Sequence, residues 1–258
     1  MPRFAANLSM MFNELPFLDR FEAAAKAGFR AVEFLFPYEF PAKEIGARLK
    51  RFDLTQALFN LPPGDWEKGE RGMAALPGRE GEFLQSLETA RPYAIATGVK
   101  RLHLMAGKIP RSDTAALARY ETAIRRAADT FGPLGIDILL EPLNTRDMPG
   151  YLLDSYDFAA DFITRLALPN LRLQFDIYHC QILHGDITMR LRTMLPIIGH
   201  IQVASIPSRN EPDSEELNDS FLFAELDRLG YAGFVGCEYR PKAGTEAGLG
   251  WFAPYRSA

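Results

Sequence analysis

Short apolar runs rich in β-branched and aromatic residues recur along this chain, and each is followed by a polar turn and a segment whose apolar residues repeat at helical spacing. Strands that alternate with helices pair in parallel through right-handed crossovers, and eight such units close into a barrel more naturally than they form an open sheet. We therefore predict a single (β/α)₈ TIM barrel domain over residues 1–258. The predicted strands are Arg3–Leu8, Arg30–Leu35, Leu54–Phe59, Arg101–Ala106, Ile136–Glu141, Leu171–Asp176, Ile198–Val203 and Phe234–Glu238.

Helical segments lie between these strands, and several of them end at a glycine, the residue that most often caps a helix before a strand. An open doubly wound sheet is less favoured, because no GxGxxG opens the first unit and no GxxxxGK[ST] occurs. The long segment 60–79, rich in Gly, Pro and charge, is expected to lie over the carboxyl-terminal mouth of the barrel. The predicted helices include Leu15–Lys26, Glu80–Thr97, Thr114–Phe131, Ser155–Leu166 and Ser220–Leu229.

Composition excludes several classes of function. The 258 residues are close to the roughly 250 typical of one α/β barrel. A net charge of −4 without clustered Lys or Arg argues against a nucleic-acid partner, and no run of about 18 apolar residues is present to span a membrane. The two cysteines are too few for a disulfide framework, and the N-terminus lacks the pattern of a signal peptide. We expect a cytoplasmic protein with a small-molecule substrate, and a homo-oligomer is compatible with a barrel of this size.

Polar side chains stand at the carboxyl ends of four predicted strands, where buried parallel strands are otherwise apolar. Glu141 ends the fifth strand, Asp176 the sixth and Glu238 the eighth, and Gln202 takes the equivalent place on the seventh. Because these ends meet at one rim of a barrel, the four side chains are expected to converge. Taken alone, Asp176 is equally well explained as the N-cap of the next helix, but four polar side chains in register favour a common site.

Three carboxylates and an amide oxygen that converge would repel one another unless a cation compensates their charge. An all-oxygen set of ligands favours Mg²⁺ or Mn²⁺ over zinc. Gln174 and His200 precede Asp176 and Gln202 by two residues and should point the same way, one layer deeper in the barrel.

An acidic substrate also needs a cation, and arginine suits a carboxylate because its planar fork matches two oxygens. His179, three residues after Asp176, is either a loop histidine or a donor to a substrate oxygen. Arg79 and Lys242 are expected to be solvated. The cations that follow strands are Arg71, Arg79, Lys108, Arg209 and Lys242, and the candidates for reading substrate hydroxyls are Asn7, Asn60, Asn144 and Asp147.

At these residues the chain resembles the hydroxypyruvate isomerase family, with its branch of 2-oxo-tetronate isomerases, within the xylose-isomerase-like barrels. The likeness covers essentially the full length. The N-terminal and C-terminal segments are more similar to the 2-oxo-tetronate branch, whereas EPLNTRDMPGY is more similar to the hydroxypyruvate enzymes. The segments that carry the resemblance are FAANLSMMF (4–12), VEFLFPY (32–38), GERGMAALPGRE (69–80), EPLNTRDMPGY (141–151), DIYHCQ (176–181), GHIQVA (199–204), GCEY (236–239) and TEAGLGWF (245–252).

The resemblance implies an isomerase that interconverts hydroxypyruvate and tartronate semialdehyde, or 2-oxo-tetronate and its 3-oxo isomer, through an enediolate. Glu141 and Glu238 would exchange the substrate proton. Related sugar epimerases carry histidine where Gln202 stands, so metal affinity or identity is expected to differ. Arg209 stands near the place of a substrate-binding arginine in those epimerases, and Arg71 lies in the family-like GERG run. The implied metal ligands are Glu141, Asp176, Gln202 and Glu238, and the predicted substrate-binding residues are His179, Arg209, Arg71, Lys108 and Asn60.

Three alternatives remain open at this point. A sugar 3-epimerase on the same barrel would use the same two glutamates but would bind a longer, neutral sugar. An endonuclease-four-like hydrolase would need a three-zinc cluster with several histidines, and the whole chain has only four. A barrel without catalytic activity could bind a sugar acid.

Overall fold

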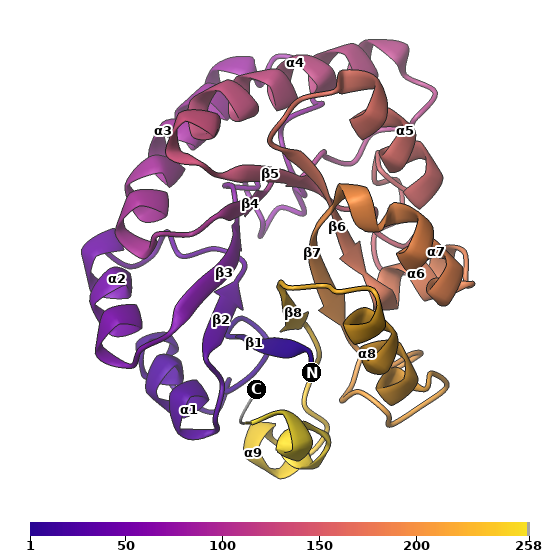
Figure 1. The fold of residues 1–258 in the computed structure, drawn as a ribbon. Coiled ribbons are helices and arrows are strands. Elements are labelled where there is room, and N and C mark those ends of the chain that lie inside the picture. The colour runs from indigo at the N-terminus through magenta and orange to yellow at the C-terminus, as the bar shows by residue number, and fades with distance from the viewer. Residues whose placement is uncertain (257–258) are drawn as a thin grey trace.

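The computed structural model, which describes residues 1–256, is a closed barrel of eight parallel strands in sequence order (Figure 1). Strand β1 pairs with β8 in a register that runs from Arg3 opposite Phe234 to Ala6 opposite Cys237, and this pairing closes the sheet. The predicted (β/α)₈ barrel is therefore confirmed. The strands are β1 (Arg3–Asn7), β2 (Ala31–Phe34), β3 (Thr55–Asn60), β4 (Arg101–His103), β5 (Asp137–Leu140), β6 (Leu171–Asp176), β7 (Ile198–Val203) and β8 (Phe234–Cys237).

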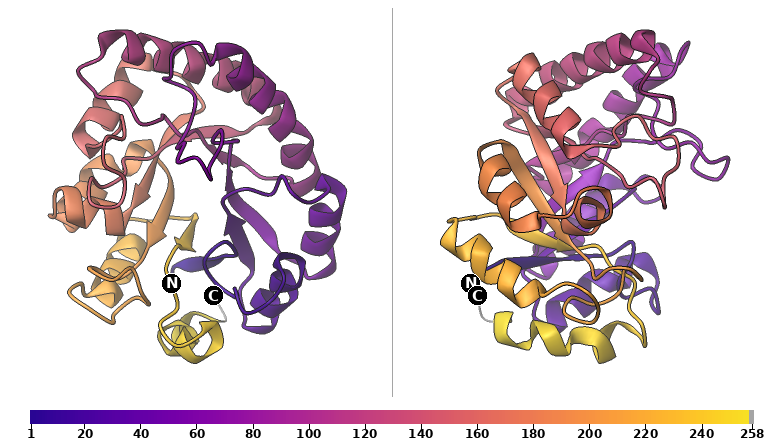
Figure 2. Two further views of the ribbon diagram at one scale, coloured as in Figure 1. Left: turned by 180° about the vertical axis from the view of Figure 1, so that it is seen from behind. Right: turned by 90° about the vertical axis from the view of Figure 1, so that its right-hand side faces the viewer.

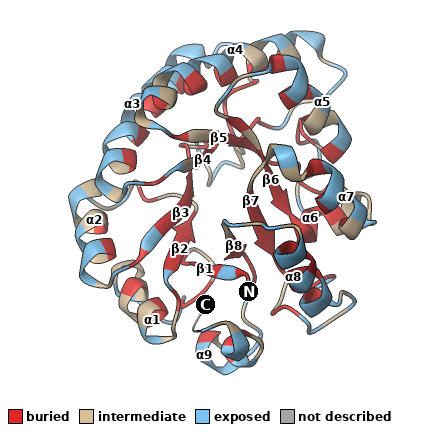
Figure 3. Cartoon of the chain, viewed as in Figure 1, coloured by how far each residue is buried: buried red, intermediate tan, exposed pale blue. Residues whose placement is uncertain are grey.

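Helices follow the strands and form a ring around the barrel (Figure 1, Figure 2). Exposed residues lie on the outward faces of these helices, whereas the strands are almost entirely buried (Figure 3). No helix within residues 1–256 is long and apolar enough to cross a membrane. The helices are α1 (Arg20–Lys26), α2 (Ala42–Arg51), α3 (Glu80–Thr97), α4 (Thr114–Phe131), α5 (Tyr156–Leu166), α6 (Ile177–Leu183), α7 (Ile187–Met194), α8 (Asp219–Arg228) and α9 (Thr245–Gly248), with 3₁₀ helices η1 (Phe17–Asp19), η2 (Gly132–Leu134), η3 (Leu195–Ile197) and η4 (Leu249–Tyr255).

The last segment of the chain, α9 and η4, packs beside the N-terminus between α1 and α8 (Figure 1). Phe252 stacks on Phe29, which follows α1, with ring centroids 4.2 Å apart. The ring centroid of Trp251 lies 5.1 Å from that of Phe4 in β1 and 6.0 Å from that of Phe223 in α8. These aromatic contacts cover the outer face of the first strand and complete the ring of helices.

The loop between β3 and α3 is tied over the mouth of the barrel, as predicted for residues 60–79. Strand β4 ends at His103, three residues before the predicted end, because the chain beyond it pairs with this loop: the amide of Ala75 donates to the oxygen of Ala106 at 3.0 Å. Gly72, with φ of 113°, approaches the same segment so closely that a Cβ would lie 2.3 Å from the oxygen of Met105. Only glycine tolerates both this conformation and this contact.

The barrel interior changes character along its axis. Ala5, Ala31 and Ala57 form a small separate apolar cluster. Barrel interiors are usually filled by branched apolar side chains, so polar residues buried there indicate a functional layer. The polar side chains that the strands bury are Asn7, Glu33, Gln56, Asn60, His103, Gln174, Asp176, His200 and Gln202.

Gly46 tests how closely α2 and α3 pack. A Cβ at this position would lie 2.5 Å from the backbone oxygen of Ala96 in α3. G46A gains about 1 kcal/mol of helix propensity, but overpacking against an oxygen that cannot move without its helix costs about 1–3 kcal/mol. We expect a lower free energy of unfolding in urea for G46A, and no loss for the control G81A, whose Cβ meets nothing within 4 Å. Equal effects of both substitutions would contradict the packing argument.

Candidate active site

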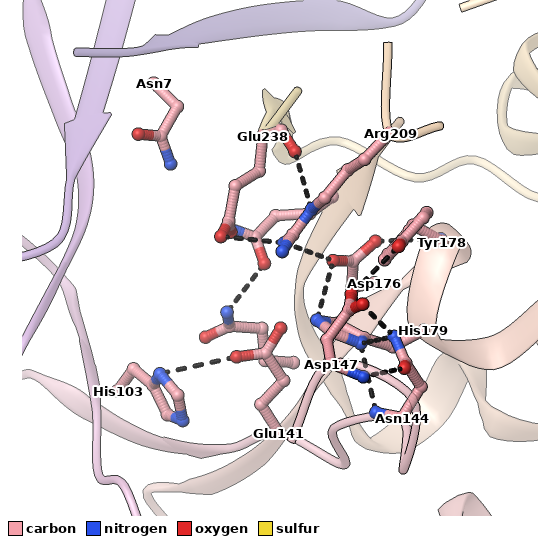
Figure 4. A network of polar contacts seen from close by, with 12 residues as sticks. Asn7, His103, Glu141, Asn144, Asp147, Asp176, Tyr178, His179, Arg209 and Glu238 are labelled. Atoms are coloured by element: carbon pink, nitrogen blue, oxygen red, sulfur yellow. Dashed lines mark hydrogen bonds and ion pairs between the residues drawn. The ribbon is translucent and has the colours of Figure 1, made fainter. Parts of the chain in front are cut away.

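A cavity of about 330 Å³ opens at the carboxyl ends of the strands, with the β3–α3 loop as one wall. Asp176 and Gln202 lie deeper and are not among its lining residues. The carboxylates of Glu141 and Glu238 lie on facing sides of the site (Figure 4). The cavity is lined by Met10, Leu35, Asn60, Trp66, Arg71, His103, Met105, Glu141, Leu143, Asp147, Met148, His179, Arg209, Glu238 and Arg240.

Glu141 directly follows β5 and is 4% exposed. Its Oε2 lies 3.4 Å from Nδ1 of His103 at the end of β4, whereas Oε1 is buried and has no hydrogen-bond partner within residues 1–256. Burial, followed by the charges of Glu238 and Asp176, raises the pKa of Glu141 well above its usual range. The protonated form of Glu141 is thereby favoured over its usual range, and a strongly shifted pKa in a cavity is typical of a functional carboxyl.

Asp176 ends β6, and its two carboxylate oxygens have different surroundings. Its Oδ1 accepts the backbone N–H of Tyr178 at 2.8 Å and caps α6. Its Oδ2 has no hydrogen-bond partner in the described chain and lies 3.5 Å from Nη2 of Arg209 and 3.6 Å from Nε2 of His179. Burial raises the pKa of Asp176 to about 6, although Arg209 opposes the shift. The N-cap role is therefore present, and the second oxygen faces Arg209 and His179.

Glu238 directly follows β8, and each of its oxygens has its own donor. Oε1 accepts from Nη2 of Arg209 at 2.9 Å, and Oε2 accepts from Nε2 of Gln202. Burial raises the pKa of Glu238 to about 8, with Arg209 opposing the shift and Asp176 adding to it. Glu238 therefore differs from Glu141, because only Glu238 is hydrogen-bonded to a guanidinium.

Arg209, in the loop after β7, is held in the left-handed region with φ of 59°. This conformation costs a non-glycine residue about 1–2 kcal/mol. It is fixed by backbone hydrogen bonds from Arg209 N to Ser205 O at 3.0 Å and from Arg240 N to Arg209 O at 2.7 Å. The guanidinium lies 4.8 Å from the ring centroid of Tyr178 and points to the carboxylates (Figure 4). Strained backbone of this kind concentrates at functional positions.

His179 is fixed as a hydrogen-bond donor. The backbone N–H of Asn144 donates to its Nδ1 at 3.1 Å, so this nitrogen carries the lone pair. Burial lowers the pKa of His179 well below its usual range, and the neutral ring therefore carries its proton on Nε2, which lies 3.6 Å from Oδ2 of Asp176. The ring therefore has a donor to offer, and its contact with a substrate oxygen stays a prediction.

Two further predicted residues line the cavity, Asn60 from the end of β3 and Arg71 from the loop above it. Arg71 lies over the indole of Trp66, with its guanidinium carbon 3.6 Å from the ring centroid. Its Nη1 donates to the backbone oxygens of Trp66 and Glu70, and its Nε is buried without a partner among residues 1–256. Arg71 is thus oriented by the loop and retains an unused donor.

The other predicted cations lie elsewhere. Lys108 is exposed, forms an isolated antiparallel bridge with Tyr151, and is not among the residues that line the cavity. Arg79 was expected to be solvated, but it pairs with Glu70 and Glu82 and braces the β3–α3 loop. Lys242 is exposed as expected.

Sequence reasoning missed His103 and Glu33. His103 ends β4 and faces Glu141, so the rule that polar strand ends converge would have found it had the strand end been placed correctly. Glu33 is fully buried within β2, and a charged residue inside an apolar strand is the signal that could have identified it. Gln174 and His200 do lie in the deeper layer predicted for them: Gln174 donates to Gln202 at 2.7 Å, and His200 lies 2.6 Å from Glu33.

Part of the donor set suits a divalent cation. Glu141, Asp176 and His179 each offer one atom, all within 4.8 Å of one another. His179 presents N–H rather than a lone pair, so it does not suit a metal, but Glu141 Oε1 and Asp176 Oδ2 are buried oxygens without donors. Gln202 uses both amide hydrogens on carboxylates and one oxygen lone pair on Gln174, which leaves one lone pair. The oxygens therefore fit a hard cation.

Comparison with known proteins shows the family to which the chain belongs. Residues 21–255 match the family described as xylose isomerase-like TIM barrel, and the chain belongs to that family. A crystal structure described as AP endonuclease, family 2, from Brucella melitensis covers 99% of this chain and 100% of that chain, with a TM-score of 0.96 and 52% identity.

Two curated relatives narrow the class. The 2-oxo-tetronate isomerase of Cupriavidus necator is 55% identical over 99% of both chains. The hydroxypyruvate isomerase of Escherichia coli is 43% identical over 99% of this chain and 100% of its own length. These matches confirm the resemblance to the hydroxypyruvate isomerase family and the prediction that the chain is an enzyme, an isomerase of the aldose–ketose type.

The raised pKa of Glu238 predicts a stability effect with a definite sign. Folded Glu238 keeps its proton up to about pH 8, whereas an ordinary glutamate loses it near 4.5. Between these values unfolding releases a proton, so this group makes the free energy of unfolding fall as pH rises. The stability of E238Q relative to the unchanged protein should therefore increase from about pH 5 to about pH 8.5, by on the order of 1–3 kcal/mol, in urea with chelator present. A difference that does not vary with pH would contradict the shift.

Proposed function

We propose that this enzyme interconverts a small 2-oxo hydroxy acid and its aldehyde or 3-oxo isomer. Glu141 and Glu238 exchange the substrate proton through an enediolate. The observation that carries the proposal is the pair of buried carboxyls on facing sides of one cavity, both with raised pKa. The four-carbon acid 2-oxo-tetronate is the first candidate substrate and hydroxypyruvate the second, in line with the identities of 55% and 43% to the relatives named for them.

Proton transfer between adjacent carbons needs a group that removes a proton from one carbon and a group that returns one to its neighbour, and two carboxyls on facing sides can divide these tasks. A carboxyl whose pKa lies near the working pH serves either purpose. The two glutamates have unlike surroundings, because Glu238 is hydrogen-bonded to Arg209 at 2.9 Å whereas Glu141 faces His103 at 3.4 Å. This difference in hydrogen bonding supports different roles for the two glutamates in proton exchange. The neutral His179 donates its Nε2–H to a substrate oxygen.

The anionic end of the substrate needs a cation that the proton-transfer groups leave free. Arg209 already contacts Glu238 and Asp176, whereas Arg71 has a buried Nε without a partner in residues 1–256. We therefore assign the substrate carboxylate to Arg71, with Arg209 beside the reacting oxygens and Asn60 near a hydroxyl. This arrangement favours an acid over the neutral sugar that a 3-epimerase would bind.

The proposal includes a divalent cation, Mg²⁺ or Mn²⁺, held by Glu141, Asp176, Gln202 and Glu238. Glu141 and Asp176 carry the oxygens without donors that support this assignment. When bound, such an ion would supply electrostatic stabilisation of the negative charge that develops on the substrate. A three-zinc hydrolase is not supported, because the acidic group found within residues 1–256 includes a single histidine.

Solvent exchange tests the chemistry. In D₂O, an enediolate route places deuterium on a substrate carbon, and NMR detects it with 2-oxo-tetronate or hydroxypyruvate as separate substrates. We expect E141Q and E238Q each to lower turnover by roughly 10²–10⁴-fold. Full turnover in both variants, or isomerisation without deuterium on carbon, would refute the assignment.

Arg71 gives a separate prediction for substrate binding. R71A removes a charged donor worth about 1.5–3 kcal/mol, so KM should rise by roughly 10- to 100-fold, with a smaller change in kcat. K68A is the matched control, because Lys68 lies on the same loop, is exposed and pairs with Asp65. Steady-state kinetics with either acid decides the matter, and an unchanged KM in R71A would remove Arg71 from the binding site.

A further inference from the structure

Below the cavity, the carboxylate of Glu33 reaches from β2 to the strands that carry the site. Its Oε1 accepts from Nε2 of Gln202 at 2.8 Å and from Nδ2 of Asn7 at 3.0 Å, and its Oε2 lies 2.6 Å from Nε2 of His200. Strands β1 and β8 separate β2 from β7 in the closed barrel. The Glu33 side chain therefore crosses the interior to reach Gln202 and His200.

Gly236 of β8 leaves the space that Glu33 occupies. A Cβ at Gly236 would lie 2.2 Å from Oε2 and 2.4 Å from Oε1 of Glu33. The φ of Gly236 is not positive, so it is this space and not the backbone conformation that requires glycine. Glu238 follows two residues later and shares its inward face. One strand thus both makes room for Glu33 and carries Glu238.

Gln202 connects the two carboxylates. One amide hydrogen is donated to Oε1 of Glu33 and the other to Oε2 of Glu238, while the amide oxygen accepts from Gln174 at 2.7 Å. The two ends of a carboxamide have nearly the same shape, so its orientation is decided by its partners. Gln174 alone does not decide it, because its own Oε1 is buried without a partner in the described chain and would accept N–H if both amides turned.

We propose that Glu33, in the space left by Gly236, is a positioning residue for Glu238. By accepting one N–H of Gln202 it fixes the amide, so that the second N–H holds the Glu238 carboxylate in the orientation used for proton transfer. The inference rests on the proposed function, since it takes Glu238 as a proton-transfer group. Without the Glu33 acceptor, the amide of Gln202 would be free to turn, and Glu238 would lose the N–H that orients its Oε2.

Two substitutions remove this acceptor in different ways. E33A deletes the carboxylate. G236A keeps it but fills its space, and the atoms that would clash belong to the end of a flexible side chain, so the barrel should still fold. E33Q is the conservative variant: its oxygen can accept from Asn7 and Gln202, and its amide can donate to His200 if the imidazole proton moves to Nδ1, which is now unpartnered within residues 1–256.

The experiment compares kcat, KM, the substrate deuterium isotope effect on kcat and the melting temperature for these variants, with G81A as control. We expect E33A and G236A to lose on the order of 10- to 100-fold in kcat, with KM changed by less than about 3-fold and a larger isotope effect. E33Q should recover about 10-fold of the loss in E33A. Because the clash needs the carboxylate, the double variant E33A/G236A should lie within about 2-fold of E33A.

Several outcomes would overturn the inference. Unchanged kcat and isotope effect in E33A and G236A would remove Glu33 from the reaction, and E33Q as slow as E33A would show that hydrogen-bond acceptance is not what matters. Additive losses in E33A/G236A would show that Gly236 does not act through Glu33. If E33A does not fold, kcat and the isotope effect of G236A are compared with those of E33Q and G81A, and a G236A variant as fast as G81A would still contradict the inference. Failure of the proposed function is separately visible, because E238Q would then keep its turnover.

Discussion

The contact of Arg209 with Glu238 and Asp176 is the interaction on which the site depends. Three carboxyls converge in a region where they are almost completely buried, and the guanidinium of Arg209, 2.9 Å from Glu238 and 3.5 Å from Asp176, favours the charged form of both against the effect of burial on their pKa. Removing one member of a buried pair leaves an uncompensated charge, which is strongly destabilising. This explains why the backbone of Arg209 is held in a left-handed conformation that costs energy.

The pKa shifts follow from the same constraint. Burial is the first cause for Glu141, Asp176 and Glu238, and the guanidinium only moderates it. A fold selected for stability alone would place donors against Glu141 Oε1 and Asp176 Oδ2, but both oxygens lack them among residues 1–256. The barrel therefore maintains a polar layer that is unfavourable for stability, supported by the apolar packing between its strands and helices.

The barrel fold and the carboxylates at its strand ends could be predicted from the sequence, because both leave local patterns in it. Apolar runs at regular intervals indicated the strands, and Glu141, Asp176 and Glu238 interrupted them at the point where strands end. Glu33 gives an equally clear signal inside β2, but its partners come from β1 and β7, which only the closed barrel brings together. The orientation of the Gln202 amide depends on partners from three other strands at once. Lys108 lies outside the cavity because its segment pairs with Tyr151, and no local sequence pattern indicates this bridge.

Recognition and proton transfer are assigned to different parts of the chain. The proposed proton-transfer groups stand at strand ends, above a hydrogen-bonded layer in which Glu33 occupies the space left by Gly236. Arg71, by contrast, is held by a loop through backbone oxygens and the indole of Trp66. Loops change more readily than strands. A shift of the Arg71 guanidinium would change the length of acid that fits while the layer beneath Glu238 stays the same, and this separation gives a physical reason why one family can include isomerases of acids that differ by one carbon.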